Sequence, residues 1–494
     1  MKFILKNKGF LTSFFAGVSL VLCFAPFNFF FIGFLSISAL FLTTNQQQNY
    51  KKTFLNGLIF GFGFFLFGNY WIAISLLVDA NQHAWLIPFA LTLIPLSLAT
   101  YIALTCLSYK YLVNRLKISQ NYQKILIFAF FWLFFELLRA TLFSGFPWNL
   151  IGYSWLFSLK LSQLASIIGV YGLSFLAILI FLLPTLFINQ TKKKTTFHHF
   201  TQLKKVDRIF FIIILSILIS SLILGHYRLN YTKLIDKNYK IRLIQANIKQ
   251  DLKWDPKEKF NNFIEHIKLS NQADINQVDM VVWSEASIPY AINNDPRLMT
   301  ALSEATPQNG VLISGALRIE GEKYYNSIFV FDKNGVKDYY DKHHLVPFGE
   351  YVPLQKYLPF IQKITQGAEG FSKGLGAKHL NINNQITISP LVCYEAIFTS
   401  YAVDKESKKP DLLINLTNDS WFGKSLGPYQ HLAMAQMRAI EYATPMIRVA
   451  NSGISAYINP FGYIEKKTAL NQKDFFDIDF KTLKQKTIYQ KIFH

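Results

Sequence analysis

Seven long apolar segments occupy most of the first half of the sequence. They cover roughly residues 9–25, 27–44, 54–78, 84–109, 125–143, 161–189 and 209–226. A helix that crosses a bilayer needs about 20 mostly apolar residues, and helices of soluble cores are rarely this long and this apolar. The first half is therefore predicted to be a polytopic α-helical membrane domain of about seven spans. The first two segments are short, and Ala25–Phe27 separates them, so one re-entrant hairpin remains an alternative there.

Charged residues are distributed unevenly along the chain. The whole sequence has 50 Lys and Arg and 30 Asp and Glu, but only 20 and 4 of these precede Asn238. The second half is nearly balanced, as is usual for a soluble domain. A boundary is expected near His226–Lys240. The predicted parts are a membrane domain over 1–226, a linker over 227–239, a folded domain over 240–475, and a tail over 476–494.

The basic residues of the first half lie in alternate loops. They occur at the N-terminal tip and after the second, fourth and sixth apolar segments, whereas the loops Asp79–Ala84 and Ser144–Ser158 contain none. Basic loops stay on the cytoplasmic side, so the N-terminus is predicted to be cytoplasmic and the second half to lie on the outer side of the membrane. This topology explains most of the net charge of +20. The soluble half shows no basic patch interleaved with aromatic residues, so nucleic-acid binding is not predicted.

The second half alternates strand-like and helix-like runs. Short apolar runs such as Tyr239–Ile248, Val278–Ser287 and Gln385–Tyr394 predict strands, and Phe260, Phe263, Ile264 and Ile267 recur at helical spacing. A second helical run, Gly427–Thr444, stands between two predicted strands. Strands and helices in alternation over about 240 residues are typical of one α/β domain.

Three chemically distinct side chains stand at or near the ends of predicted strands. Glu285 ends "MVVWSE", Cys393 ends "ISPLVC", and Lys342 lies between them in "YYDKHHLVPFGEYVP". In α/β sheets, catalytic groups gather at strand ends. A nearby Lys⁺ lowers the pKa of a thiol, and a carboxylate can accept the thiol proton and return it to a leaving group. Lys342 and the backbone N–H after Cys393 are candidates to hold a developing oxyanion.

Each of these residues also has a purely structural interpretation. Glu285 and Lys342 could be solvated charges at strand ends, and a free cysteine is commonly a small buried hydrophobe. Cys393 is the only cysteine of the second half, so that half cannot form an internal disulfide. An unpaired thiol in an oxidising compartment is a liability unless it is used or hidden. Cys23 and Cys106 lie in apolar segments, where filling space is the expected role.

The motifs around these residues resemble those of a known superfamily. Glu285 in "VVWSEASIP", Lys342 in "YDKHHLVPFGEYVP" and Cys393 in "PLVCYEAIF" are similar to the Glu-Lys-Cys triad of the nitrilase superfamily. Over roughly residues 9–470 the chain resembles the apolipoprotein N-acyltransferase family of Gram-negative bacteria. That likeness includes "QANIKQDLKWDP", "NLTNDSWFGKSLGPYQHLAMAQMRAIEYATPMIRVANSGISAYINPFG" and, in the membrane half, "FELLRATLFSGFPWNLIGYSW".

The resemblance implies an αββα sandwich, a reaction and a set of site residues. An acyl chain passes from a membrane phospholipid, usually phosphatidylethanolamine, to a cysteine thioester, and then to the free α-amino group of a diacylglyceryl-cysteine on a lipoprotein. Cys393 is the implied nucleophile, Glu285 the base and Lys342 the oxyanion stabiliser. Supporting roles are implied for Trp254, Glu350, Tyr394 and Glu395. No cofactor or metal is implied, the ten His residues show no metal spacing, and a monomer in the bacterial inner membrane is expected.

Some features stay open at this level. Family members usually end in an eighth span, whereas the tail here is predicted to lie on the membrane surface through Phe475, Phe476, Phe480 and Leu483, or to be solvated. Glu136 and Arg139, within one apolar segment, are expected to form an ion pair or to contact a lipid headgroup. Two other functions are a membrane-anchored amide or nitrile hydrolase that uses water as acceptor, and a non-catalytic scaffold or transporter.

Overall fold

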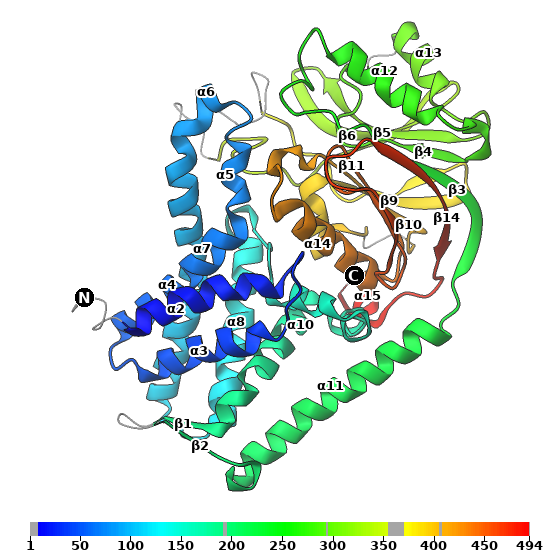
Figure 1. Ribbon diagram of the computed structural model, residues 1–494. Coiled ribbons are helices and arrows are strands. Elements are labelled where there is room, and N and C mark those ends of the chain that lie inside the picture. Colours follow the sequence, from blue (N-terminus) through cyan, green and yellow to red (C-terminus); the bar gives the residue numbers. More distant parts are fainter. Residues whose placement is uncertain (1–7, 191–194, 293–294, 354–369, 405–407, 494) are drawn as a thin grey trace. The chain divides into compact units, whose positions relative to one another are not determined.

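The structure is a computed structural model that describes residues 8–190, 195–292, 295–353, 370–404 and 408–493. It divides into two compact units. The first contains the chain up to Ala73 together with Trp85–Tyr231, and the second contains Ile74–Ala84 together with the chain from Thr232 onward. Figure 1 shows that the first unit is almost entirely helical and that the second contains the large sheets.

The N-terminal half is built from helices that are mostly long and apolar. Its helices are α2 (Lys8–Leu20), α3 (Ile32–Gln46), α4 (Tyr50–Asn69), α5 (Trp71–Ser75), α6 (Ala80–His83), α7 (Ile87–Arg115), α8 (Asn121–Thr141), α9 (Leu159–Ser162), α10 (Ala165–Leu182) and α11 (Lys205–Tyr231). Two short strands, β1 (Ile188–Gln190) and β2 (Thr195–Phe197), pair antiparallel between α10 and α11.

Among the residues that the structure describes, four helical stretches are long and apolar enough to cross a bilayer. They are Ala80–Arg115, Asn121–Ser144, Ala165–Phe187 and Lys205–Tyr231. These coincide with the last four of the seven predicted segments. The first three segments contain α2, α3 and α4, which have 13, 15 and 20 residues. The chain is a membrane protein, and seven spans remain a prediction.

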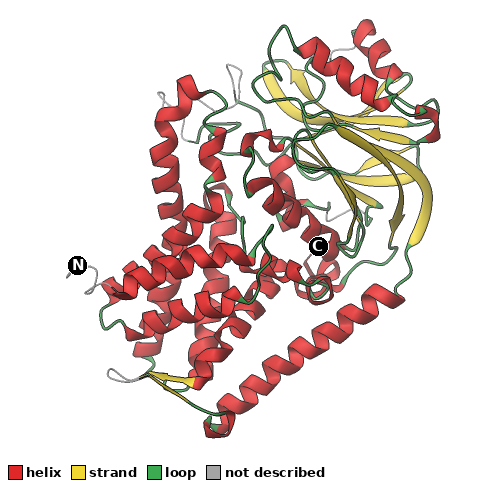
Figure 2. Ribbon diagram, in the orientation of Figure 1, coloured by secondary structure: helices red, strands yellow, loops and turns green. Residues whose placement is uncertain are grey.

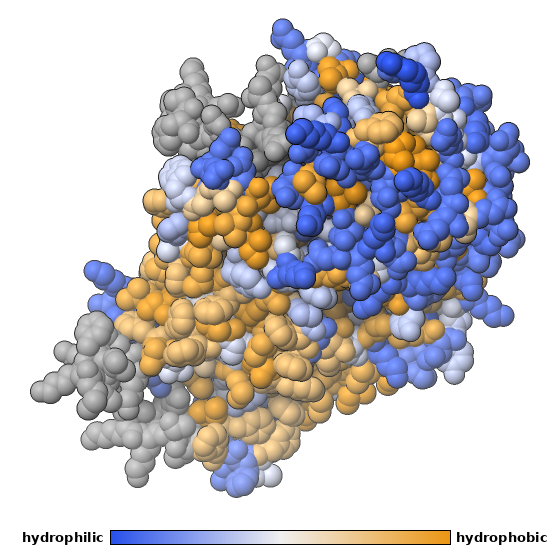
Figure 3. All heavy atoms as spheres, turned by 45° about the horizontal axis from the view of Figure 1, so that its top comes forward, coloured by the Kyte–Doolittle hydropathy of each residue, from blue (hydrophilic) through white to orange (hydrophobic). Residues whose placement is uncertain are grey.

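Small residues allow two of these helices to pack closely. A Cβ atom on Gly61 of α4 would lie 2.8 Å from the Cα atom of Ala99 in α7, and one on Gly57 would lie 2.8 Å from the Cα atom of Ala103. Within a bilayer, where lipid is as apolar as leucine, such close backbone approach is a main source of helix association. On the face drawn in Figure 3, the surface of this unit is largely hydrophobic, whereas that of the second unit is mostly hydrophilic.

The second unit contains two six-stranded sheets. The first has the strand order β14-β3-β4-β5-β6-β7 and the second has the order β13-β12-β11-β10-β9-β8. In each sheet, three adjacent strands are parallel and the flanking strands are antiparallel. The strands of the first sheet are β3 (Ile235–Gln245), β4 (Met280–Val282), β5 (Val311–Glu320), β6 (Lys323–Asp332), β7 (Gly335–Asp341) and β14 (Asp474–Thr482). Those of the second are β8 (Leu380–Ile382), β9 (Ile386–Val392), β10 (Leu412–Thr417), β11 (Met446–Ala450), β12 (Ala456–Ile458) and β13 (Ile464–Lys467).

The residue alternation of the strands builds three apolar layers. Met280 and Val282 of β4 point into a core shared with Leu412 and Ile414 of β10, so this core lies between the two sheets. Val281 points the other way, toward α12 (Lys259–Ser270) and α13 (Pro296–Glu304). The outer face of the second sheet packs against α14 (Gly427–Tyr442) in the same manner. The result is the predicted αββα sandwich, with helices outside both sheets (Figure 2).

The C-terminal tail differs from the prediction. Residues 474–482 form β14, which pairs antiparallel with β3 at the edge of the first sheet, and Phe480 is fully buried between the sheets. Phe476, Ile478 and Phe480 alternate with Asp477 and Asp479 because they belong to a strand. The interpretation of this stretch as a membrane-surface or solvated tail was wrong, and the α/β fold continues past residue 475. A short helix, α15 (Ile488–Phe493), follows.

Candidate active site

Cys393 stands at the carboxyl end of a parallel strand in an uncommon backbone conformation. It directly follows β9 and has φ of +51°, in the left-handed region that non-glycine residues rarely occupy. Such strain persists at functional sites because the surrounding fold imposes it. The last registered pair between β9 and β10 is Val392 with Leu416, so Cys393 and Thr417 are adjacent at the strand ends. The Thr417 hydroxyl lies 3.2 Å from the Cys393 sulfur.

Glu285 follows β4 at the equivalent end of the first sheet. Its backbone runs so close to β5 that a Cβ atom on Gly315 would lie 2.8 Å from the Cα atom of Glu285, so only glycine fits there. The carboxylate is buried, and its Oε1 atom accepts a hydrogen bond of 2.8 Å from Asn326 Nδ2. Asn326 Nδ2 also lies 3.1 Å from Glu350 Oε1, so this amide joins two carboxylates.

Lys342 and Glu350 form a buried ion pair next to this amide. Lys342 directly follows β7 and is 1% exposed, and its ammonium lies 2.9 Å from the Glu350 carboxylate. Burial alone would lower the pKa of Lys342, but the charges of Glu350 and Glu285 hold it above its ordinary value. Glu350 also accepts a bond of 2.8 Å from the Val346 N–H, which folds the loop after Lys342 back onto the pair. Lys342 is therefore permanently charged at this site.

The charges of Glu285 and Lys342 both affect the pKa of the Cys393 thiol. Burial, and then the Glu285 carboxylate, raise the pKa of the thiol to about 12, while Lys342 acts in the opposite direction. The resting group is therefore a neutral thiol, and a nucleophilic thiolate forms only if a base removes its proton. Glu285 is a carboxylate close enough to influence that thiol, and Lys342 supplies a fixed positive charge. The structure thus brings the three predicted triad residues into one electrostatic cluster.

Glu395 connects the cysteine strand end to the lysine segment. Its Oε1 atom accepts hydrogen bonds from the Tyr340 hydroxyl at 2.9 Å and from the backbone N–H groups of His343 and His344 at 2.9 and 3.1 Å. Its Oε2 atom accepts a bond of 2.8 Å from the Val392 N–H. Burial alone would raise the pKa of Glu395, but His343 and Lys342 hold it below its ordinary value. Glu395 therefore fixes the positions of the residues that flank Lys342 and Cys393.

The other two predicted supporting residues are aromatic. Tyr394 is half-buried, and its ring centroid lies 5.9 Å from that of His344 and 5.1 Å from that of Phe398. Trp254 is half-buried, and its ring centroid lies 6.0 Å from the ammonium nitrogen of Lys253. Among the described contacts, Trp254 reaches the triad only through this lysine.

Lys253 was not predicted, although it adjoins the predicted Trp254. It is buried, and its ammonium donates a hydrogen bond of 2.8 Å to the backbone carbonyl of Glu285. Burial lowers the pKa of Lys253 to about 8, against the opposing effects of Glu285 and Cys393. A cavity of about 10 Å³ lies beside it, lined also by His266, whose Nε2 atom is buried and has no partner in the described structure. A cavity of that size holds about one water molecule.

A second buried network lies behind the cysteine. The Asp419 carboxylate accepts a bond of 2.6 Å from Arg448 and lies 3.0 Å from His431 Nδ1. His431 Nε2 is 3.2 Å from the Cys393 carbonyl oxygen. Burial alone would raise the pKa of Asp419, but Arg448 and His431 hold it far below its ordinary value. The strand-end position of Asp419 was visible in the sequence, whereas its partners come from α14 and β11.

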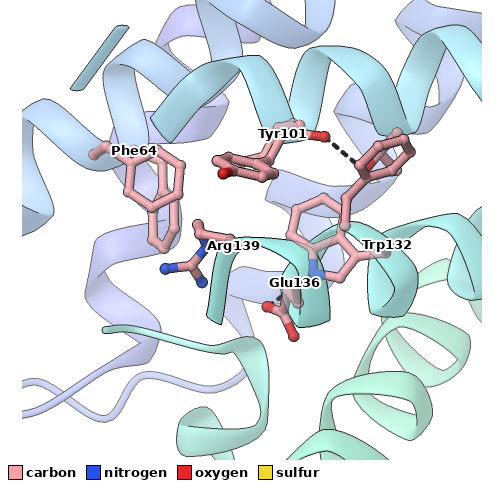
Figure 4. Close-up of a pocket in the computed structure, with 9 residues that line it drawn as sticks. Phe64, Tyr101, Trp132, Glu136 and Arg139 are labelled. Carbon is pink, nitrogen blue, oxygen red and sulfur yellow. Dashed lines mark hydrogen bonds between the residues drawn. The ribbon is translucent and has the colours of Figure 1, made fainter. Parts of the chain in front are cut away.

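The charged residues of the membrane half are arranged differently. Arg139 donates bonds of 2.6 and 2.8 Å to the Phe146 and Trp148 carbonyls, and Glu136 accepts bonds from Trp132 Nε1 and the Ile151 N–H at 3.1 and 2.9 Å. The expected Glu136–Arg139 ion pair is absent from the described residues, where Arg139 donates to the two carbonyls and both of these donors to Glu136 reach its Oε1 atom. Both residues line a cavity of about 10 Å³ (Figure 4).

Comparisons with known proteins agree with this division of the chain. Residues 16–183 match the model of the apolipoprotein N-acyltransferase N-terminal domain, and residues 240–485 match that of the carbon-nitrogen hydrolases. The apolipoprotein N-acyltransferase of Rickettsia typhi is 38% identical over 94% of this chain and 90% of its own length. That of Brucella melitensis is 34% identical over 93% of this chain and 87% of its own length.

The αββα sandwich with its strand-end thiol thus places the second unit among the carbon-nitrogen hydrolases, here joined to a helical membrane half. Both domain models match in the order expected for one particular family, and the relatives match over nearly the whole chain. The chain belongs to the apolipoprotein N-acyltransferase family.

Proposed function

We propose that this enzyme takes an acyl chain from a phospholipid onto Cys393 and passes it to the α-amino group of a lipoprotein's diacylglyceryl-cysteine. The observation that carries the proposal is that Glu285, Lys342 and Cys393 follow strands β4, β7 and β9 and act on one another electrostatically, in a chain of this family. A neutral thiol next to a carboxylate and a fixed ammonium has the groups that acyl transfer requires.

The first half-reaction forms a thioester. Glu285 accepts the thiol proton, the sulfur attacks the ester carbonyl of the lipid, and Lys342 stabilises the developing oxyanion. The carbon–oxygen bond then breaks, and Glu285 returns the proton to the leaving lysophospholipid oxygen. In the second half-reaction the lipoprotein amine attacks the thioester, Glu285 accepts a proton from that amine, and the carbon–sulfur bond breaks. Glu285 then passes the proton that it took from the amine to the sulfur, which restores the thiol. The Glu350 carboxylate pairs with the Lys342 ammonium and keeps it protonated. Glu395 fixes the two segments that carry Lys342 and Cys393.

The membrane half suits this chemistry because both substrates are lipids. A thioester exposed to bulk water is open to hydrolysis, so a site that receives its substrates from the bilayer favours transfer to the amine. Phosphatidylethanolamine is the proposed donor, and a monomer is the proposed functional form. The alternation of basic loops supports a multi-pass protein of the bacterial inner membrane, with a cytoplasmic N-terminus and the α/β unit on the periplasmic side.

The test is the covalent intermediate. The purified protein is incubated with phosphatidylethanolamine that carries a labelled acyl chain, with no acceptor present. One equivalent of lysophospholipid should appear in a burst, and the label should remain on Cys393 until hydroxylamine cleaves the thioester. Cys393→Ala should form no adduct, while Cys23→Ala and Cys106→Ala serve as matched controls that retain it.

The acceptor is tested in the same preparation. Addition of a diacylglyceryl peptide with a free N-terminus should move the label onto its α-amino group, as mass spectrometry of the peptide would show. Release of free fatty acid without peptide acylation would instead identify a hydrolase. Full transfer by Cys393→Ala would overturn the proposed mechanism. Orientation is tested separately, because a membrane-impermeant amine label on spheroplasts should reach the α/β unit without lysis.

A further inference from the structure

The carboxyl ends of β9 and β10 place a hydroxyl against the sulfur. Thr417 is the last residue of β10 and is fully buried, and its Oγ1 atom lies 3.2 Å from Cys393 Sγ. In the part of the chain that the structure describes, this is the one side-chain hydrogen bond that reaches the sulfur. A valine would fill the same space without a donor, so packing alone does not require a hydroxyl here.

The same hydroxyl has a second acceptor. Asp419 Oδ1 lies 3.1 Å from Thr417 Oγ1, and Arg448 and His431 keep that carboxylate ionised. A hydroxyl carries one proton and therefore donates to one acceptor at a time, although its oxygen can accept another bond meanwhile. Thr417 thus has two available states, which differ by a rotation about its Cβ–Oγ1 bond.

The protonation state of the sulfur decides between these two states. While Cys393 is a thiol, the Thr417 hydroxyl can donate a hydrogen bond to Asp419, and its oxygen can accept a hydrogen bond from the thiol S–H. Once Glu285 has taken that proton, the sulfur becomes an anion, and the Thr417 hydroxyl can turn to donate to it. No covalent bond of Thr417 breaks, and the proton of the thiol remains on Glu285 throughout.

We propose that Thr417 is a further catalytic residue, whose hydroxyl turns from Asp419 to the Cys393 sulfur and stabilises the thiolate in both half-reactions. The inference rests on the proposed function, because it requires Cys393 to be the nucleophile. The Lys342 ammonium is engaged by Glu350 at 2.9 Å, so it contributes charge near the sulfur while Thr417 contributes the hydrogen bond. The other charged groups that interact electrostatically with the thiol are Glu285, Asp419 and Lys253.

The test compares Thr417→Val, which keeps the shape and removes the hydroxyl, with Thr417→Ser, which keeps the hydroxyl. Iodoacetamide alkylation of Cys393 in the full-length protein is followed at fixed pH by mass spectrometry of the Cys393 peptide. A hydrogen bond to an anion implies that Thr417→Val alkylates about ten- to a hundredfold more slowly. Thr417→Ser should stay close to the native rate. Thr387→Val, a half-exposed position on β9, is the matched control and should alkylate at the native rate.

Acylation supplies the second readout. Single-turnover formation of the acyl-enzyme and its transfer to the peptide should both slow in Thr417→Val, because a thiolate forms in each step. Thr417→Ala replaces Thr417→Val if the latter shows no cooperative melting transition, and the same slowing is expected. Native alkylation rates in the folded variant would overturn the inference, and so would a Thr417→Ser rate as slow as that of Thr417→Val.

These outcomes are separate from failure of the proposed function. If Cys393→Ala still transfers acyl chains, the nucleophile is wrong and the inference falls with it. If Cys393→Ala is inactive while Thr417→Val alkylates and acylates normally, only the role of Thr417 is wrong.

Discussion

Both halves of the protein bury acidic and basic side chains, but they connect them in opposite ways. In the membrane half, Glu136 and Arg139 lie on one helix, and most of their hydrogen bonds reach residues 132–151, with Ser174 as a further partner of Glu136. In the α/β half, Glu285, Lys342 and Cys393 come from three different strand ends and influence one another electrostatically. The first arrangement fastens a helix to the loop that follows it, and the second concentrates charge around one reactive atom.

The difference shows how to separate structural charges from functional ones. A buried charge whose partners are close in sequence is explained by the local fold, since those partners satisfy it wherever the rest of the chain lies. Glu285, Lys342 and Cys393 come from distant strands, and their electrostatic effects on one another serve no such local need. Perturbed ionisable groups that cluster at strand ends are the usual mark of an active site. Substitutions in each half can test this distinction.

The largest effect is expected at Lys342. Lys342→Met removes the fixed positive charge between Glu350 and Glu285 and the group proposed to hold the oxyanion. Loss of such a group slows catalysis by about a thousandfold, so the burst of lysophospholipid should nearly vanish. Lys337→Met, at an exposed position of β7 in the same sheet, is the matched control and should keep the burst. A normal burst in Lys342→Met would show that the cluster is structural, like that of the membrane half.

Glu350→Gln should have the next largest effect. The amide keeps the shape but loses the charge that holds Lys342, and a charged hydrogen bond of this kind is worth about ten- to a hundredfold in rate. Glu322→Gln, at an exposed position of the β5–β6 turn, should have no effect. The measurement is single-turnover acyl-enzyme formation together with a thermal melt. Near-native turnover in Glu350→Gln would remove Glu350 from the proposed machinery.

Arg139→Met should separate stability from chemistry. The substitution leaves the Phe146 and Trp148 carbonyls without their donor, and a buried acceptor that loses its partner costs about 1–3 kcal/mol. The melting temperature in detergent should therefore fall, whereas acyl-enzyme formation per folded molecule should stay native. A variant that melts normally but forms no acyl-enzyme would break the comparison, because Arg139 would then act in the chemistry.

Much of the fold and the triad could be predicted from the sequence, because each rests on local patterns. Apolar runs indicated the main strands, Glu285 and Cys393 stood out at the ends of such runs, and the resemblance to the nitrilase superfamily joined Lys342 to them. Helix α13 was not predicted, although Asp295 caps it and Pro296 begins it. The pairing of β14 with β3 is also non-local, since it joins residues more than two hundred positions apart.

The residues around the triad could not be predicted for a related reason. Asn326 lies in the middle of β6, and only the pairing of the strands brings its amide to Glu285 and Glu350. Thr417 lies next to Cys393 because β9 and β10 are parallel and in register. The sequence of either strand alone does not reveal that pairing. The ion pair expected between Glu136 and Arg139 was wrong, because both side chains instead form hydrogen bonds with nearby backbone groups, which a sequence pattern does not reveal.

Lys253 gives the smallest expected effect and lies between the two cases, because it holds the local carbonyl of Glu285 and also faces the site. Its pKa is lowered from an ordinary value of 10.5 to about 8, so the folded protein disfavours the charged form. The unfolded chain binds more protons than the folded one between these two values, so the free energy of unfolding should rise with pH in that window. The penalty is complete below pH 8, and it disappears as the pH approaches 10.5. This group alone contributes a slope of up to about 1.4 kcal/mol per pH unit to the free energy of unfolding.

Melting of the native protein and of Lys253→Met at several values from pH 8 to 10 measures the difference, and the variant should lack this part of the rise. An identical pH dependence in both proteins would show that Lys253 carries no buried charge at the site.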